Sequence, residues 1–184
     1  MRITVFAGSS RRATLAHLDA ARALGAEIAR RGHELDYGGG RTGSMGALAD
    51  GALAAGGFVR GVILKRFIDE DVHHLGVEMF SVEDMRSRKA GLDERADAFV
   101  ALPGGLGTFE ELTEVLSFRK LELHHRPVVL LDVGGFWEPL LALFERAIAD
   151  GFERPDHRRY WSVAGSPAEA VAFCEAGARP LPAE

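Results

Sequence analysis

Short apolar runs alternate with longer segments of helical periodicity along the whole chain. The short runs are partly β-branched and predict strands at residues 3–7, 33–37, 58–64, 78–82, 97–102 and 127–133. The longer segments place apolar residues at helical spacing and predict helices at residues 14–31, 45–55, 84–95, 108–123, 137–149 and 167–176. The polar segment 65–77 is expected to be a loop. Strands that alternate with helices predict an α/β fold, in which a mostly parallel sheet is covered by helices on both faces.

Length and composition narrow the class of protein. At 184 residues the chain is expected to form one domain over 1–176, followed by a loose tail, GARPLPAE, over 177–184. The formal net charge is −5 and no long basic block occurs, so a nucleic-acid partner is not expected. Cys174 is the only cysteine, which excludes an internal disulfide and a cysteine metal cluster.

The amino-terminal segment and the hydropathy pattern indicate where in the cell the protein is expected. MRITVFAGSS is typical of a strand and lacks the basic region and the long apolar region of a signal peptide. No apolar run approaches the length of a membrane span. We therefore expect a cytoplasmic protein with no membrane partner.

Turns rich in glycine or serine follow several predicted strands: AGSS at 7–10, GGGRTGSMG at 38–46 and PGGLGT at 103–108. Ligands of open α/β sheets bind beyond the carboxyl ends of the strands, near the point where the strand order reverses. We therefore expect these turns to converge on one crevice. The second turn contains G-x-G-x-x-G, but the acid expected about twenty residues later in a dinucleotide site is missing. We interpret it as a nucleotide-binding turn and not as an NAD site.

The turn at 103–108 leads directly into a helix that carries Glu110 and Glu111 near its start. Free N–H groups at a helix N-terminus, together with glycines that let the backbone approach an anion, favour a phosphate cradle. A tight turn that binds nothing is the alternative. Glu111 also has two interpretations. It can close a capping box with Thr108, or it can face the sugar of a phosphorylated ligand, where positive charge could develop.

A carboxylate at this helix start repels phosphate unless a cation offsets it. Arg88, within MRSRK at 85–89, can supply that cation because its guanidinium can clamp phosphate or sugar oxygens, and the adjacent Lys89 is a second anion ligand. An arginine on a solvated helix face is the alternative. The histidine pairs at 73–74 and 124–125 are adjacent residues and lack the spacing of a helical zinc pair, so no metal is expected.

Together these motifs resemble the signature of the LONELY GUY (LOG) family. YGGGRTGSMG at 37–46, MRSRK at 85–89 and PGGLGTFEE at 103–111 carry the resemblance, and the family pattern P-G-G-x-G-T-x-x-E is matched in full. The resemblance begins at VFAGSS near the amino terminus and continues to DGF, so it covers most of the chain.

The sequence departs from the family at two stretches. Family members usually read M-H-E-R-K, whereas Arg86 and Ser87 stand here in place of the middle pair. The usual G-V-I-P becomes GVILK, so that Leu64 and Lys65 occupy the end of that motif. Both departures bear on the base pocket, and hence on whether a prenylated adenine is the substrate.

The resemblance implies a Rossmann-like, doubly wound fold and a phosphoribohydrolase. Such enzymes cleave the N-glycosidic bond of N6-modified adenosine 5′-monophosphates, and many also act on AMP; they release an adenine-type base (a cytokinin) and ribose 5-phosphate. Arg88 and Glu111 are implied as the catalytic pair. The implied substrate-binding residues are Gly8, Ser9, Gly39, Gly40, Met45, Glu78, Lys89, Gly104, Gly105, Gly107, Thr108 and Ser117. No cofactor or metal is implied, and the assembly is a homodimer or a larger homo-oligomer with the site near the subunit interface.

A non-catalytic protein on the same fold is the competing interpretation. A protein resembling the molybdenum-cofactor carriers would bind a phosphorylated ligand and cleave nothing. The Arg88 and Glu111 pair favours the enzyme, since a pure carrier does not need it. Release of free adenine from AMP distinguishes the two.

Overall fold

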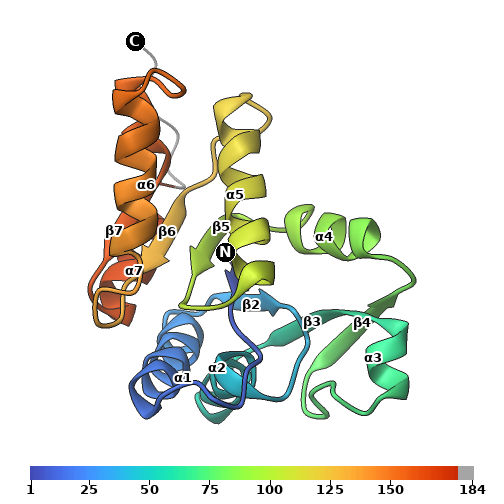
Figure 1. Cartoon of the computed structure of the whole chain (residues 1–184). Helices are drawn as coiled ribbons and strands as arrows, with labels where there is room; N and C mark the ends of the chain where they lie inside the picture. Colours follow the sequence, from blue (N-terminus) through green and yellow to red (C-terminus); the bar gives the residue numbers. More distant parts are fainter. Residues whose placement is uncertain (178–184) are drawn as a thin grey trace.

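A seven-stranded parallel sheet forms the centre of the computed structural model, which describes residues 1–177 (Figure 1). The strands follow the spatial order β4-β3-β2-β1-β5-β6-β7. Their bounds are β1 Arg2–Phe6, β2 Glu34–Tyr37, β3 Val59–Leu64, β4 Glu78–Val82, β5 Ala98–Ala101, β6 Val128–Leu131 and β7 Ser162–Ala164. The chain builds outward from β1 to β4 and then crosses back to place β5 beside β1. The strand order therefore reverses between β1 and β5.

Helices cover both faces of the sheet, as Figure 1 shows. Their bounds are α1 Leu15–Arg30, α2 Gly43–Ala54, α3 Lys65–Asp69, α4 Met85–Asp93, α5 Leu106–Lys120, α6 Glu138–Ala149 and α7 Pro167–Gly177, with a 3-10 turn, η1, at Pro155–Tyr160. One apolar cluster joins α1, α2 and α7 to one face. A second cluster joins α5 and α6 to the other face, which α4 also covers. This arrangement confirms the predicted doubly wound α/β fold.

The predicted elements are confirmed with small shifts at their ends, and the structure adds three. The segment 65–77 is not wholly a loop, because its first residues form α3. The strand β7 and the turn η1 were not predicted, since three strand residues and a short 3-10 turn carry too little periodicity to detect. The expected loose tail begins one residue too early, because Gly177 is still the last residue of α7. The remainder, 178–184, lies outside the described residues.

The helices α1 and α2 cross with their backbones in direct contact. A Cβ atom placed on Gly25 of α1 would overlap the Leu48 carbonyl oxygen of α2, and one placed on Gly51 would overlap the Arg22 carbonyl oxygen. Such close packing needs residues without a side chain at both positions. Since α2 begins at Gly43, within the second glycine turn, this crossing fixes where that turn lies.

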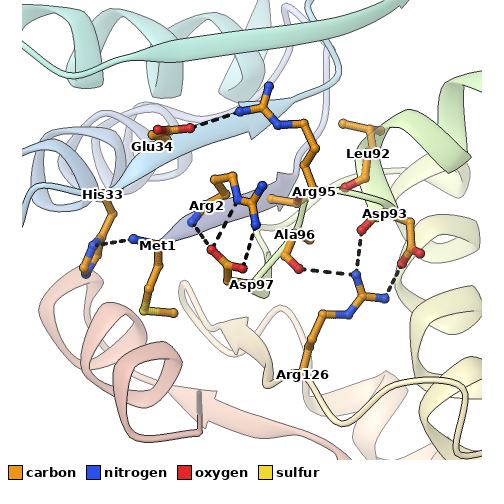
Figure 2. A network of polar contacts seen from close by, with 11 residues as sticks. Met1, Arg2, His33, Glu34, Leu92, Asp93, Arg95, Ala96, Asp97 and Arg126 are labelled. Atoms are coloured by element: carbon orange, nitrogen blue, oxygen red, sulfur yellow. Dashed lines mark hydrogen bonds and ion pairs between the residues drawn. The ribbon is translucent and has the colours of Figure 1, made fainter. Parts of the chain in front are cut away.

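Ion pairs tie the elements together at the amino-terminal edge of the sheet (Figure 2). Arg126 donates to the Asp93 carbonyl oxygen at 2.6 Å and to the Asp93 Oδ1 at 2.7 Å, at the last residue of α4. Arg2 and Asp97 pair at 3.1 Å between β1 and the start of β5. The end of α4 is thereby anchored at this edge, and its first turn points toward the opposite, carboxyl edge.

We predict that Gly25→Ala destabilises the protein. Alanine favours a helix by about 1 kcal/mol over glycine, but the added methyl group must push two backbones apart, which typically costs about 1–3 kcal/mol. The net effect is a lower midpoint of thermal unfolding, measured by circular dichroism. Gly107→Ala is the matched control for folding, because nothing lies within 4 Å of its Cβ position. A Gly25→Ala protein as stable as this control would contradict the interpretation of the crossing.

Candidate active site

The predicted convergence of the glycine turns is confirmed at the carboxyl edge of the sheet. A Cβ atom on Gly8, after β1, would lie 3.2 Å from the Cα of Gly104, after β5. The Met45 N–H donates to the Gly8 carbonyl oxygen at 3.1 Å, and the Thr42 hydroxyl donates to the Ser9 carbonyl oxygen at 2.8 Å. Backbone from all the turns thus meets beside the point where the strand order reverses. This is the place where open α/β sheets bind ligands.

The first turn of α5 presents free backbone N–H groups. The N-cap is Gly105, which offers no side chain for capping. The first backbone bond of the helix runs from the Phe109 N–H to the Gly105 carbonyl oxygen at 3.0 Å, so the N–H groups before Phe109 have no partner within the helix. Together with the partial positive charge of a helix start, these groups form a site suited to an anion.

The capping-box interpretation of Thr108 and Glu111 is wrong. The helix begins at Leu106, so Thr108 lies within its first turn instead of preceding it. The Thr108 side chain is buried against the turn, where a Cβ atom on Gly104 would overlap its hydroxyl. Glu111 therefore does not fold back onto the helix start, and its carboxylate is available for another role.

Glu111 instead forms a buried ion pair with Arg88 of α4. The Arg88 Nη1 donates to the Glu111 Oε1 at 2.9 Å, and the two residues are 7% and 6% exposed. The Arg88 Nε donates to the Val62 carbonyl oxygen of β3 at 3.2 Å, which fixes the plane of the guanidinium. No described residue donates a hydrogen bond to the Glu111 Oε2. The alternative of a solvated arginine at position 88 is therefore wrong.

The helix α4 is held in place where it presents Arg88. Asp84 is its N-cap and accepts from the backbone N–H groups of Arg86 at 2.8 Å and Ser87 at 3.0 Å. The Ser87 hydroxyl also donates to the Asp84 carboxylate at 2.7 Å. Ser87, one of the departures from the family pattern, thus strengthens the cap that positions the next residue, Arg88.

Glu110, the other acid at the start of α5, is also paired with a cation. Lys89 Nζ lies 2.9 Å from the Glu110 Oε1 and 3.1 Å from the Glu114 Oε1. Both glutamates near the proposed phosphate cradle are therefore matched by cations from α4. This answers the electrostatic problem that two acids beside an anion site would otherwise pose.

Burial raises the pKa of the Glu111 carboxyl group above its usual value, because removal from water disfavours the charged form. The charge and hydrogen bond of Arg88 oppose this change and favour the carboxylate. The fraction of Glu111 that is ionised thus depends directly on where the Arg88 guanidinium lies.

A groove of about 360 Å³ separates α4 from α5 and reaches Glu111. Apolar and charged side chains line it: Phe6, Arg86, Lys89, Ala90, Leu92, Asp93, Glu94, Glu111, Glu114, Val115 and Phe118. None of these lining residues lies in a glycine turn, so the groove approaches Glu111 from between α4 and α5.

The structure brings together most of the predicted site residues but not Glu78 or Ser117. Glu78 is exposed at the start of the edge strand β4, where it pairs in register with Arg60. Ser117 lines a separate cavity of about 150 Å³ beside α6 and η1, together with residues such as Phe144 and Tyr160. Within this chain, neither side chain contacts the glycine turns among the described residues.

The sequence analysis missed Gly38 as a site residue. A Cβ atom on Gly38 would overlap the Arg88 Nη2, so the guanidinium lies against the backbone of the second glycine turn. The run of glycines at 38–40 was the available signal. His73 was also missed as a neighbour of this turn, to which it is joined by an isolated antiparallel bridge with Gly40.

Within residues 1–177, no three His, Cys, Asp or Glu side chains are grouped as the ligands of a metal ion would be. No helix in this part of the chain is both long and apolar enough to cross a bilayer.

One family model and several known proteins are similar in sequence to this chain. A family model described as "Possible lysine decarboxylase" matches residues 45–174. A rice (Oryza sativa subsp. japonica) protein named "Probable cytokinin riboside 5′-monophosphate phosphoribohydrolase LOGL1" is 45% identical over 159 residues, which is 86% of this chain and 71% of the relative. The cytokinin riboside 5′-monophosphate phosphoribohydrolase of Rhodococcoides fascians is 45% identical over 85% of this chain and 80% of its own length. The Arabidopsis thaliana protein LOG5, of the same name, is 39% identical over 95% and 77%.

Solved structures share the fold. The molybdenum cofactor binding protein of Rippkaea orientalis superposes with a TM-score of 0.73 at 25% sequence identity and covers 95% of each chain. The molybdenum cofactor carrier protein of Chlamydomonas reinhardtii has the same TM-score at 24% identity, which shows the fold alone. The family model and the relatives at 39–45% identity show that this chain belongs to the LONELY GUY (LOG) family.

Proposed function

We propose that this protein hydrolyses the N-glycosidic bond of adenosine 5′-monophosphates, including N6-modified ones, and releases the free base and ribose 5-phosphate. The observation that carries the proposal is the buried Arg88–Glu111 pair beside an uncapped, glycine-flanked helix N-terminus. The names of relatives at 39–45% identity support the same reaction.

The phosphate is bound by backbone N–H groups in this proposal. The first turn of α5, from Gly105 to Thr108, supplies donors and a favourable dipole, and the space around the Cβ positions of Gly105 and Gly107 is open to a ligand. Binding of the phosphate places the ribose toward Glu111, about one helical turn further along α5. Free nucleosides lack this anchor and bind weakly.

Glu111 carries the chemistry at the anomeric carbon. Cleavage of a glycosidic bond passes through an oxocarbenium-like transition state, which a nearby carboxylate stabilises. One oxygen of Glu111 is held by Arg88, and the other, Oε2, is left to face the sugar or to accept a proton from the attacking water. Water adds to the anomeric carbon while the C–N bond breaks and its electron pair leaves with the base, which takes up a proton. Arg88 keeps Glu111 ionised and offsets the phosphate charge.

The carrier alternative has less support. A protein that only binds a phosphorylated ligand needs the cradle, but it gains nothing from burying an arginine–glutamate pair, whose desolvation is costly. The solved structures named for molybdenum-cofactor binding match at 25% identity or less, well below the phosphoribohydrolases. Incubation with AMP and detection of free adenine tests the choice directly.

A lysine decarboxylase activity, suggested by the wording of the family model, does not fit the lysines of this chain. That reaction usually uses a lysine that forms a Schiff base with pyridoxal phosphate. Lys65 and Lys120 lie at the surface in ion pairs, and Lys89 is held by Glu110 and Glu114. None is placed as a free, buried amine.

The proposal also includes the cytoplasm as the location and a homodimer or larger homo-oligomer as the assembly. The single free cysteine, Cys174, is compatible with a reducing compartment. Subunit association could bring residues that lie outside the crevice of this chain, such as Glu78 and Ser117, toward the site of a neighbouring copy. Light scattering coupled to size-exclusion chromatography measures the assembly.

We predict that Glu111→Gln lowers kcat on AMP by about 10²–10⁴-fold, because the neutral amide can neither stabilise the developing charge nor accept a proton. Chromatographic detection of released adenine measures the rate, and circular dichroism checks the fold. Glu145→Gln, which removes a surface pair with Arg158, is the matched control and should retain full activity. Near-normal turnover by a folded Glu111→Gln protein would exclude Glu111 from the mechanism.

We predict that activity declines on acidification at a higher pH than an ordinary glutamate requires. The pKa of Glu111 is raised by burial, and the carboxylate is the active form. Activity is therefore complete above the raised pKa and falls as the pH drops through it, above the ordinary carboxyl value of about 4.3. The acid limb of log kcat/KM against pH measures this value; an acid limb at or below the ordinary value would contradict the assignment.

We predict that the 5′-phosphate determines substrate recognition. The substrates compared are AMP and N6-isopentenyladenosine monophosphate and the corresponding nucleosides. The kcat/KM of each nucleoside should be at least roughly 10²-fold lower than that of its nucleotide, since the nucleoside loses charge-assisted hydrogen bonds to the α5 N-terminus. Comparison of the two nucleotides reveals the preferred base. Nucleosides that react as fast as nucleotides would remove the cradle from the mechanism.

A further inference from the structure

The Arg88 guanidinium occupies the space that a side chain at Gly38 would need. Gly38 directly follows β2, at the start of the second glycine turn. An ideal Cβ atom on this residue would overlap the Arg88 Nη2 and would lie 3.0 Å from the Met45 Cε. The surface of the turn at Gly38 is therefore one wall of the slot that holds the guanidinium.

Space, and not backbone conformation, requires glycine at this position. The next residue, Gly39, has a φ of +78°, which most residues avoid, but Gly38 is not among the residues with positive φ. An alanine could therefore adopt the backbone of Gly38 without strain. The three atoms nearest to its Cβ position belong to the ends of two long side chains, Arg88 and Met45.

The Arg88 side chain cannot retreat from a new methyl group without loss. Its Nε is bonded to the Val62 carbonyl oxygen at 3.2 Å and its Nη1 to the Glu111 Oε1 at 2.9 Å. The end of Met45 is held by no hydrogen bond and can change rotamer. A methyl group at position 38 therefore acts mainly on Arg88 and leaves the backbone of the turn in place.

We propose that Gly38 is a positioning residue: the side chain that it lacks leaves the slot that sets the Arg88 guanidinium against Glu111. This inference rests on the proposed function, in which that contact keeps Glu111 ionised. Gly38 touches no substrate in this role and acts only through Arg88. Substitution of Gly38 by alanine therefore lowers the turnover rate and leaves the fold intact.

Displacement of Arg88 also changes the charge that faces Glu111. Besides Arg88, the charged groups that shift its pKa are Lys89 of α4, which is engaged by Glu110 and Glu114, and Glu110 of α5 itself. Arg86, Asp93, Glu94 and Glu114 also line the groove beside Glu111. Lys89 favours the ionised form and Glu110 disfavours it. With Arg88 moved away, burial acts with less opposition, so the Glu111 carboxyl titrates at a higher pH.

We predict that Gly38→Ala lowers kcat on AMP by roughly 10²-fold, the effect typical of a misplacement of about 1 Å in a catalytic constellation. KM changes less, because the α5 amides that bind phosphate are untouched. The acid limb of the pH profile moves to higher pH, and carbon-13 NMR titration of the Glu111 carboxyl moves in the same direction. Gly165→Ala is the matched control, since the nearest atom to its Cβ position is a side-chain oxygen at 3.7 Å, and it should change none of these quantities.

A double-mutant cycle with Arg88→Lys isolates the route of the effect. Lysine has no Nη2, so Gly38→Ala should add little loss in the Arg88→Lys background, in activity and in stability alike. Additive losses would overturn the inference, as would a Gly38→Ala enzyme with normal kcat and an unmoved Glu111 titration. If Gly38→Ala alone fails to fold, the lysine background should restore folding; failure in both backgrounds also overturns the inference. An inactive wild-type protein would instead refute the proposed function, and the NMR titration would still test the slot.

Discussion

The contact between Arg88 and Glu111 is the interaction on which the rest of the site depends. Burying an ion pair removes two charges from water and rarely stabilises a fold by itself. The Arg88–Glu111 pair orients one carboxylate oxygen, leaves the other without a donor among residues 1–177, and joins two helices that flank the carboxyl edge of the sheet. A buried charge of this kind is better explained by chemistry than by stability.

Charge balance around the start of α5 follows from the same arrangement. The proposed anion site, made of backbone N–H groups, lies beside two glutamates, which would weaken anion binding if they were free. Arg88 pairs with Glu111, and the adjacent Lys89 of α4 pairs with Glu110 and Glu114. The fold is shared with molybdenum-cofactor binding proteins, and fold alone does not decide function. In the proposed function, it is the paired side chains at the cradle, and not the sheet, that make this protein a hydrolase instead of a carrier.

The fold was largely predictable because its signals are local. Each βα unit shows its strand as a short apolar run and its helix as a periodic one, and the order of these units implies a parallel sheet. The glycine turns at 7–10, 38–46 and 103–108 were expected to meet because parallel strands place their carboxyl ends at one edge. The strand β7 and the helix α3 escaped, since elements of three and five residues carry almost no period.

The sequence by itself determined six of the seven strands, the three converging turns, and the identity of Arg88 and Glu111 as candidates. It left open whether Glu111 capped its own helix, because Thr108 and Glu111 have the spacing of a capping box and local spacing is all that a sequence shows. Only the tertiary structure decided this, by starting α5 at Leu106 and bringing α4 across to it. The slot at Gly38 was equally hidden, because it exists only where a turn after β2 meets a side chain from α4, fifty residues later in the chain. Contacts between residues so far apart in sequence are set by how whole elements pack.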